Sequence, residues 1–99
     1  MEEFGGPFVI YNMRKNLSEI LKAFDAGVAK SGKTCWTNGS TVYSYQLPIV
    51  KRDNEDLIWI RESYPSITTQ TQINACKAYF SQGRGFQVSS DLGRIVAKP

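Results

Sequence analysis

The Asn38-Gly39 pair is the sequence feature that most restricts how this chain can fold. In the tightest β-hairpins both turn residues adopt positive φ, which asparagine and glycine tolerate better than other residues. Residues of high strand propensity, among them threonine, tryptophan, valine and tyrosine, lie on both sides of the pair. The pattern predicts two antiparallel strands, at residues 33–37 and 40–46, joined by this turn.

Three further strands are predicted along the chain. Residues 49–52 and 57–62 lie on either side of an acidic turn, residues 57–62 begin with an apolar run, and residues 86–89 follow a glycine-containing turn. Residues 8–11 (FVIY) form either one more strand or an apolar lead-in that packs on the core. Residues 95–96 add a short strand or simply cover the core.

A first helix is predicted from Asn16 to Gly32. Asn16 is a favourable N-cap, and Glu19 follows three residues later, as in a capping box. Gly32 is placed to end the helix as a left-handed cap. The apolar stripe of this helix falls at helical spacing and consists of Leu17, Ile20, Leu21, Phe24 and Val28.

A second helix is predicted to begin near Thr69, which forms a capping-box pattern with Gln72. The Gln82-Gly83 pair is expected to close this helix. Its apolar stripe consists of Ile73, Cys76 and Phe80.

The 99 residues are expected to form a single domain, because a chain of this size can bury one core and little more. We predict an α+β fold in the order α-β-β-β-β-α-β, with an antiparallel sheet of three to five strands and both helices packed on one face. Tyr43 and Tyr45 would then share one face of their strand. The other sheet face is left for water, a partner or a second copy of the chain.

Composition argues against an enzyme and against a metal site. The chain has no histidine, which removes the usual general base near neutral pH and the commonest metal ligand. Its two cysteines, Cys35 and Cys76, are expected to be buried thiols. The carboxylates of Asp53, Glu55 and Asp56 fall in a predicted solvated turn, and no phosphate-binding or nucleophile motif is present. We therefore expect a non-enzymatic protein without a cofactor.

The charge of the chain is mildly basic, with a formal net value of +3. Residues 1–65 carry eight basic and eight acidic side chains, so the whole excess lies in residues 66–99. This is far from the dense basic stripe of a dedicated DNA-binding protein. No apolar run reaches the roughly 20 residues of a membrane span, and the acidic N-terminus is unlike a signal peptide. We expect a cytoplasmic protein with no membrane partner.

One group of candidate binding residues combines aromatic and basic side chains: Tyr43, Tyr45, Lys51, Arg52, Arg61 and Arg84. Bases stack on aromatic rings and cationic side chains contact phosphates, so this group fits nucleic acid. Tyrosine and arginine also anchor protein interfaces, so it also fits a protein partner or a homodimer. In the ordinary alternative, the tyrosines are plain strand residues, and Trp36 and Trp59 belong to the core.

A second candidate group is the polar stretch at residues 66–72 (SITTQTQ). Helix capping accounts for its first residues, since serine and threonine side chains accept hydrogen bonds from free backbone N–H groups. Capping does not account for all of the polar side chains that follow. The candidate binding residues here are Thr68, Thr69, Gln70, Thr71 and Gln72.

Three segments, CWTNGSTVYSYQLPI, LIWI and YPSITTQTQIN, carry a family resemblance. Across residues 34–80 the chain resembles small uncharacterised proteins encoded by phages, prophages and some archaeal elements. It departs from them at Pro65 and Ser66, which alter the Tyr-Ser spacing, and at Gln72, near which a histidine is common. The resemblance implies a mobile-element origin and carries no catalytic role. The matching residues are Thr37, Asn38, Gly39, Tyr43, Ser44, Tyr45, Tyr64, Thr68 and Thr69.

Two functional hypotheses follow from the sequence. In the first, the chain is a small non-enzymatic phage or mobile-element accessory protein. It binds a host or viral macromolecule, most readily a protein, and inhibition of a host defence system is one such activity. In the second, it is a small nucleic-acid-binding protein that uses exposed aromatic and basic residues of the sheet.

Overall fold

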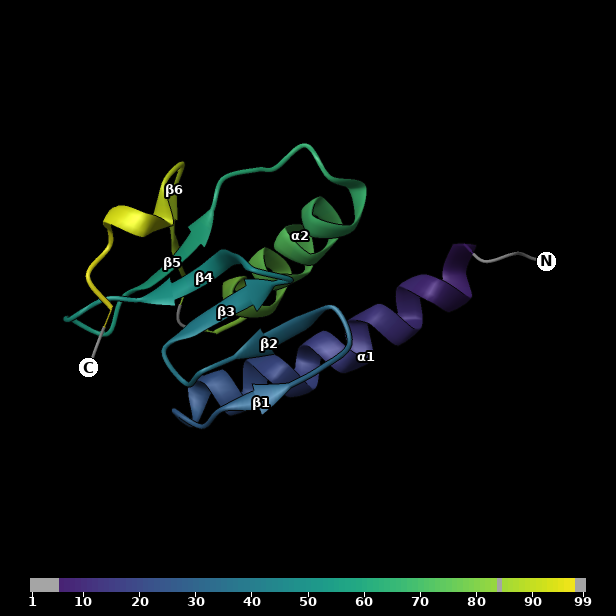
Figure 1. Ribbon diagram of the computed structural model, residues 1–99, viewed down its shortest axis with the longest axis horizontal. Helices are drawn as coiled ribbons and strands as arrows, with labels where there is room; N and C mark the ends of the chain where they lie inside the picture. The colour runs from purple at the N-terminus through teal and green to yellow at the C-terminus, as the bar shows by residue number, and fades with distance from the viewer. Residues whose placement is uncertain (1–5, 84, 98–99) are drawn as a thin grey trace.

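Two α-helices and a six-stranded sheet make up the part of the chain that the structure describes. The computed structural model describes residues 6–83 and 85–97. The strands are neighbours in chain order, β1-β2-β3-β4-β5-β6, across one sheet (Figure 1). The elements are α1 (Gly6–Asp25), β1 (Lys30–Ser31), β2 (Cys35–Thr37), β3 (Thr41–Ser44), β4 (Leu47–Arg52), β5 (Ile58–Arg61), α2 (Ile67–Ser81), β6 (Gln87–Ser89) and the 3₁₀ turn η1 (Leu92–Arg94).

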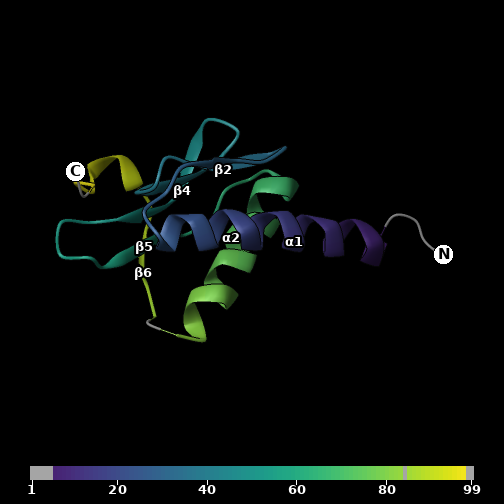
Figure 2. The same cartoon turned by 90° about the horizontal axis from the view of Figure 1, so that it is seen from below.

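The predicted α+β class is confirmed, although the sheet has six strands where at most five were predicted. Strands β1 to β5 pair with their neighbours in antiparallel fashion. Strand β6 pairs with β5 in parallel, because α2 lies between them in the chain and makes the crossover that a parallel pair needs. Figure 2 shows α1 and α2 on the same side of the sheet, as predicted.

Helix α1 begins ten residues earlier than the sequence predicts, at Gly6 instead of Asn16. Residues 8–11 are therefore helical, and of the two alternatives given for them the strand is wrong. Asn16 lies inside the helix and does not cap it. A run of four consecutive apolar residues has no period of its own, so its conformation follows the helix into which it continues.

The C-terminal end of α1 lies before Gly32, the residue predicted to cap it. Gly27 has a φ of 73°, and the backbone N–H of Val28 donates to the carbonyl oxygen of Ala23 at 2.9 Å. The N–H of Gly27 donates to the carbonyl oxygen of Phe24 at 3.0 Å. This is the Schellman closure, which requires a left-handed residue after the helix. Val28 consequently lies beyond the helix, and its side chain is exposed.

The core lies between the two helices and the sheet and contains both predicted apolar stripes, Val28 excepted. The rings of Phe24 and Phe80 meet edge to face with centroids 6.0 Å apart, which connects α1 to α2. Both cysteine thiols are buried and free, as predicted. Each large side chain buried here contributes about 1.5–3 kcal/mol to folding. The core side chains are Leu17, Ile20, Leu21, Phe24, Cys35, Val42, Ile49, Val50, Ile58, Ile60, Ile73, Cys76 and Phe80.

The hairpin predicted at Asn38-Gly39 is confirmed between β2 and β3. Of the pair, only Gly39 has a positive φ, 103°. Asn38 acts through its side chain, whose Oδ1 accepts hydrogen bonds from the backbone N–H groups of Ser40 and Thr41, each at 3.0 Å. A Cβ at Gly39 would lie 2.8 Å from the carbonyl oxygen of Gly27. The turn therefore packs directly against the end of α1, and only glycine fits there.

Arg52, a predicted binding residue, is buried where this turn meets α1, with 7% of its surface exposed. Its guanidinium donates to the carbonyl oxygens of Gly39 at 2.8 Å and Phe24 at 2.6 Å. The guanidinium carbon also lies 4.3 Å from the centre of the Phe24 ring. A cation at the last carbonyls of a helix is favoured by the helix dipole. Arg52 thus joins α1, the β2–β3 turn and β4, and it is buried, whereas the sequence placed it among exposed basic residues of the sheet.

The sheet face opposite the helices is partly covered by the C-terminal segment, whereas the sequence left this face open. Lys51 lies on that face because it alternates with the buried Arg52. Its Nζ donates to the carbonyl oxygens of Leu92 at 3.1 Å and Ile95 at 2.8 Å. Figure 2 shows η1 on the side of the sheet away from α1 and α2. Residues 95–96 do not form the predicted short strand, and with Val96 exposed they do not cover the core either.

The β4–β5 turn is ordered by the carboxylate of Asp53. Its oxygens accept hydrogen bonds from the indole Nε1 of Trp59 at 2.8 Å and from the backbone N–H groups of Glu55 at 2.8 Å and Leu57 at 3.0 Å. These hydrogen bonds, that of Trp59 foremost, hold the pKa of Asp53 below its ordinary value of 3.8. Trp59 is half-buried, and the prediction that it belongs to the core is wrong because its indole serves this turn.

Replacing Arg52 by methionine is expected to lower the free energy of unfolding by about 2–4 kcal/mol, because two interior carbonyl oxygens lose a charged donor. Urea unfolding followed by circular dichroism measures the change. Arg94→Met is the matched control, since Arg94 is exposed, and a change within about 0.5 kcal/mol is expected. Equal stability losses in the two variants would contradict the role given to Arg52.

Replacing Asp53 by asparagine is expected to destabilise the fold at neutral pH and to do so less in acid. The pKa of Asp53 is lower in the folded than in the unfolded chain, so the charged form stabilises the fold above the unfolded pKa. That stabilisation is lost as the pH falls through the folded pKa. The difference in Tm between the parent protein and the variant should therefore shrink below about pH 4. A difference that stays constant from neutral pH into acid would argue against it.

Candidate functional site

The predicted aromatic face of the sheet divides into a packed part and an exposed part. The rings of Trp36 and Tyr43 stack with centroids 4.0 Å apart and planes 10° from parallel, and both are half-buried. Trp36 therefore lies on the sheet surface, and its predicted place in the core is wrong. Tyr45 lies beyond the end of β3 in the β3–β4 turn, so it does not continue the face of Tyr43.

The predicted basic residues do not converge on one surface. Lys51 holds the C-terminal segment and Arg52 holds the end of α1, as described above. Arg61 is half-buried, and its Nε donates to the carbonyl oxygen of Pro48 at 2.8 Å. Arg84 lies outside the described residues. Each of the three described cations thus has a hydrogen-bonding partner within the fold.

The buried members of the polar stretch at residues 66–72 anchor α2 to the sheet. Thr69 is buried, and its Oγ1 lies 3.0 Å from Oγ of Ser44 in β3. Gln72 is completely buried, and its Nε2 donates to Oγ1 of Thr34 at 2.8 Å. Its Oε1 has no hydrogen-bond partner among the described residues. Thr69 and Gln72 are thus interior residues whose side chains hold α2 in place, and Thr69 also lines a cleft described below.

The more exposed members of the same stretch serve the start of α2. Ser66 is the N-cap, and its Oγ accepts from the backbone N–H of Thr69 at 3.5 Å. Gln70 accepts the backbone N–H of Tyr64 at 2.8 Å, and Thr71 donates to the carbonyl oxygen of Ile67 at 2.8 Å. Thr68 is half-buried. The capping interpretation is confirmed for Ser66, which replaces Thr69 as the cap.

A cleft forms where the β3–β4 turn meets the start of α2. We call it the turn cleft, and its volume is about 390 Å³. It brings together two segments that the sequence singled out separately, the tyrosine-containing turn and the polar stretch. The buried hydroxyl pair of Ser44 and Thr69 belongs to its lining. The residues that line it are Ser44, Tyr45, Gln46, Leu47, Tyr64, Ser66 and Thr69.

Tyr45 occupies a backbone conformation that a bulky residue rarely adopts. Its φ is 56°, in the left-handed region that glycine and asparagine favour in such turns. Its N–H donates to the carbonyl oxygen of Thr34 at 2.9 Å, and its own carbonyl oxygen accepts the indole N–H of Trp36 at 2.6 Å. These two hydrogen bonds hold the strained conformation, and the tyrosine side chain remains 57% exposed.

Two more exposed apolar side chains belong to the same part of the chain. Tyr64 lines the turn cleft and is exposed, and Ile67, the first residue of α2, is 87% exposed. We call Tyr45, Tyr64 and Ile67 the apolar rim. Large apolar side chains grouped at the surface are typical of sites that bind another macromolecule.

Neither cysteine thiol is suited by its surroundings to act as a nucleophile. Burial raises the pKa of the Cys35 thiol to about 11, and burial also raises the pKa of Cys76, so neither is a ready nucleophile. Among the described residues, no group of three or more cysteine, aspartate or glutamate side chains is placed to hold a metal ion. No helix in the described ranges is both long and apolar enough to cross a membrane.

No protein-family model matches the chain, and no curated protein or solved structure is similar to it at a significant level. The candidate site is therefore defined by the arrangement of this chain's own residues.

Sequence reasoning missed two of the three members of the apolar rim, Tyr64 and Ile67. Ile67 carries a detectable signal, since it lies off the apolar stripe that Ile73, Cys76 and Phe80 define on the same helix. An apolar residue on the polar side of a helix is exposed when the helix packs by its stripe. Tyr64 has no comparable signal, because its position depends on how the β5–α2 connection folds.

Replacing Tyr45 by asparagine is expected to stabilise the protein by about 0.5–1 kcal/mol, because asparagine tolerates the left-handed conformation. This corresponds to a rise of about 2–8 °C in Tm for a domain of this size. Gln46→Asn in the same turn is the control, and it should bring no gain because Gln46 has no positive φ. A loss of stability in Tyr45→Asn would show that the tyrosine is retained for the fold.

Proposed function

We propose that this protein is a non-enzymatic binding protein that docks on a protein partner through the turn cleft and its apolar rim. The observation that carries the proposal is Tyr45, an exposed aromatic residue in a left-handed conformation. Such strain persists where the surroundings enforce it, and it concentrates at functional sites. Because its side chain is mostly exposed, Tyr45 gains little packing energy within its own chain, and that gain does not offset the cost of the strained backbone.

The composition of the site favours a protein over a small ligand. Two tyrosines and a leucine line a cleft of about 390 Å³, which suits one inserted side chain, and the exposed Ile67 follows the lining residue Ser66 in the chain. Tyrosine is among the residues that most often dominate binding energy at protein interfaces. The cleft lining includes seryl, threonyl and glutaminyl side chains that can donate or accept hydrogen bonds from a partner.

Nucleic acid is the less favoured partner. Backbone phosphates are bound by lysine and arginine, and the binding weakens as salt rises. Lys51, Arg52 and Arg61 already donate to carbonyl oxygens of this chain. None of the residues that line the turn cleft is charged. In an electrophoretic shift assay at low salt, micromolar protein should leave both single- and double-stranded DNA unshifted.

We propose further that the partner belongs to a bacterial host and that the binding occurs in the host cytoplasm. The resemblance of residues 34–80 to phage and prophage proteins motivates this assignment, and the departure at Gln72 leaves it without a catalytic role. A small protein of this kind acts by covering a surface of its target. Inhibition of a host defence system is the activity that such covering most directly supplies.

Affinity capture from a nuclease-treated bacterial lysate tests the proposal, with the tagged chain as bait and mass spectrometry as the readout. Tyr45→Asn and Ile67→Asp should each reduce recovery of the partner at least ten-fold, because they remove rim side chains. An aspartate at the first position of α2 is compatible with the helix dipole, so Ile67→Asp should still fold.

Val96→Asp is the matched control for this capture, since Val96 is also an exposed apolar residue and lies outside the turn cleft. This variant should recover the partner at the level of the parent chain. The proposal is wrong if both rim variants recover the same protein at full yield. It is equally wrong if nuclease treatment abolishes all specific capture.

A further inference from the structure

Residues 27–34 read GVAKSGKT, and this order of residues matches the pattern of phosphate-binding loops. The pattern is a glycine, any four residues, and then Gly-Lys-Ser or Gly-Lys-Thr. In nucleotide-binding proteins the backbone N–H groups and the lysine of such a loop hold phosphate oxygens. The expectation that the chain carries no phosphate-binding motif is therefore wrong.

The fold places this motif outside the setting of a nucleotide-hydrolysing loop. Such a loop follows a strand and opens a helix, whereas Gly27 ends α1 and Thr34 leads into β2. The threonine hydroxyl of the motif holds Mg²⁺ in those proteins. Here Oγ1 of Thr34 accepts a hydrogen bond from Nε2 of the buried Gln72 at 2.8 Å. Two parts of the motif keep their capacity to bind phosphate, the lysine and the backbone.

The motif lines a hollow between α1 and the hairpin of β1 and β2. Figure 1 shows β1 at the edge of the sheet and beside α1. The N–H of Gly32 donates to the carbonyl oxygen of Cys35 at 2.8 Å, and a Cβ at Gly32 would lie 2.9 Å from that oxygen, so glycine closes the hairpin. We call the hollow the basic hollow, and its volume is about 390 Å³. The residues that line it are Asn16, Glu19, Ile20, Lys30, Ser31, Gly32 and Lys33.

The donors of this hairpin are not used by the fold. Within residues 6–83 and 85–97, the amines of Lys30 and Lys33 form no ion pair and no hydrogen bond. The backbone N–H groups of Lys33 and of Thr34 beside it donate to no acceptor in the same ranges. Successive free N–H groups in a turn form a concave site that binds anions. The hairpin thus differs from the three cations described above, each of which donates to a carbonyl oxygen of this chain.

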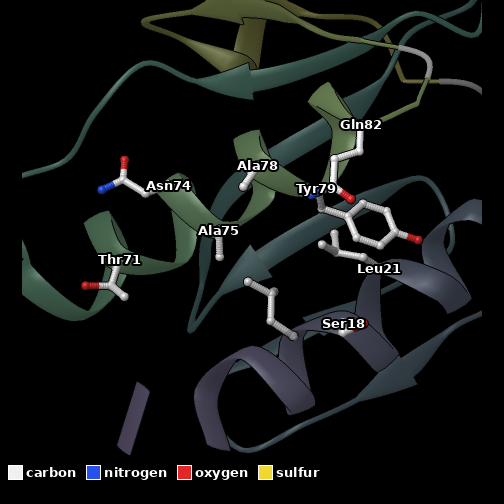
Figure 3. A pocket seen from close by; sticks show the side chains of 9 residues that line it. Ser18, Leu21, Thr71, Asn74, Ala75, Ala78, Tyr79 and Gln82 are labelled. Carbon is white, nitrogen blue, oxygen red and sulfur yellow. The ribbon is translucent and has the colours of Figure 1, made fainter. Parts of the chain in front are cut away.

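The hollow on another side of α1 has a different character. It lies between α1 and α2 and has a volume of about 420 Å³. Figure 3 shows Ala75 and Ala78 of α2 across from Ser18 and Leu21 of α1. None of its lining residues is charged, and none of those that line the turn cleft is charged either. Neither of these two hollows therefore offers a cation to an anionic ligand.

We propose that the basic hollow binds the phosphate group of a small phosphorylated ligand. Lys30 and Lys33 supply the positive charge, and the free backbone N–H groups of the hairpin supply further donors. The volume suits one small molecule and excludes a DNA duplex. Of the lining residues, Glu19 alone is acidic. Its carboxylate repels the phosphate and limits the affinity, because like charges across a small hollow oppose each other.

Isothermal titration calorimetry of the full chain with inorganic phosphate, tripolyphosphate and ATP tests this site. Each anion should bind at low salt, and binding should weaken as salt rises. Lys30→Gln and Lys33→Gln should each weaken it about ten-fold, because a charged hydrogen bond to phosphate is lost. Glu19→Gln should strengthen it, since the repelling carboxylate is removed. Lys22→Gln is the matched control, an exposed lysine of α1 outside the hollow, and it should bind like the parent chain.

The choice of anions separates the sources of the phosphate group. Equal affinity for tripolyphosphate and ATP would support recognition of phosphate alone, and tighter binding of ATP would support a nucleotide. Adenosine, which lacks phosphate, should not bind. Tighter binding of duplex DNA than of ATP would overturn the assignment to a small ligand.

Three further outcomes would overturn the site. The parent chain could bind none of the three anions at concentrations up to about 10 mM, beyond the range of specific association. Lys33→Gln could bind as tightly as the parent chain while circular dichroism shows it folded. Lys22→Gln could lose as much affinity as Lys33→Gln, which would assign the binding to the overall positive charge. Tyr45→Asn should bind phosphate like the parent chain, and Lys33→Gln should recover the protein partner from lysate at full yield, so failure of this site and failure of the proposed function are distinguishable.

Discussion

The fold depends on the hydrogen bonds of one buried guanidinium. Arg52 donates from β4 to the β2–β3 turn and to the last turn of α1, three elements that are distant in the chain. The close approach of Gly39 to Gly27 makes these hydrogen bonds possible, since a Cβ at Gly39 would collide with the helix end. Carbonyl oxygens at a helix end and in a tight turn have no other donor in a dry interior, so a cation there satisfies both. The orientation of α1 against the sheet follows from this contact.

Local signals predicted the elements whose formation needs only local chemistry. The Asn38-Gly39 hairpin and the two apolar stripes are of this kind, because turn propensity and helical spacing act within a few residues. The end of α1 was misplaced at Gly32 because two glycines were available, and the choice of Gly27 depends on packing against Gly39. Arg52 was misread for a similar reason. An arginine on a strand has the same sequence signature whether it faces solvent or the end of a helix.

In the candidate site, too, the sequence predicted features that depend on neighbouring residues and missed those that depend on tertiary packing. Tyr45 could be named from the sequence as an aromatic residue of a strand, but its left-handed backbone depends on the length of the β3–β4 turn. The turn cleft needs α2, which begins only at Ile67, to start beside a turn that ends at Gln46. Ile67 could have been found from its position off the helical stripe. Tyr64 could not, since a connection without regular structure has no periodicity to read.

Thr34 explains how the strain at Tyr45 is maintained. Its carbonyl oxygen accepts the N–H of Tyr45, while its hydroxyl accepts the buried amide of Gln72. The Ser44–Thr69 hydroxyl pair is a second polar contact between α2 and the sheet close by. Buried hydrogen bonds are costly to break without replacement, so α2 and the β3–β4 turn are held in one relative position. The Oε1 of Gln72 has no hydrogen-bond partner among the described residues, whereas its Nε2 donates to Thr34. This donated hydrogen bond fixes α2 to the residue whose carbonyl oxygen holds Tyr45, and so it secures the geometry beneath the turn cleft.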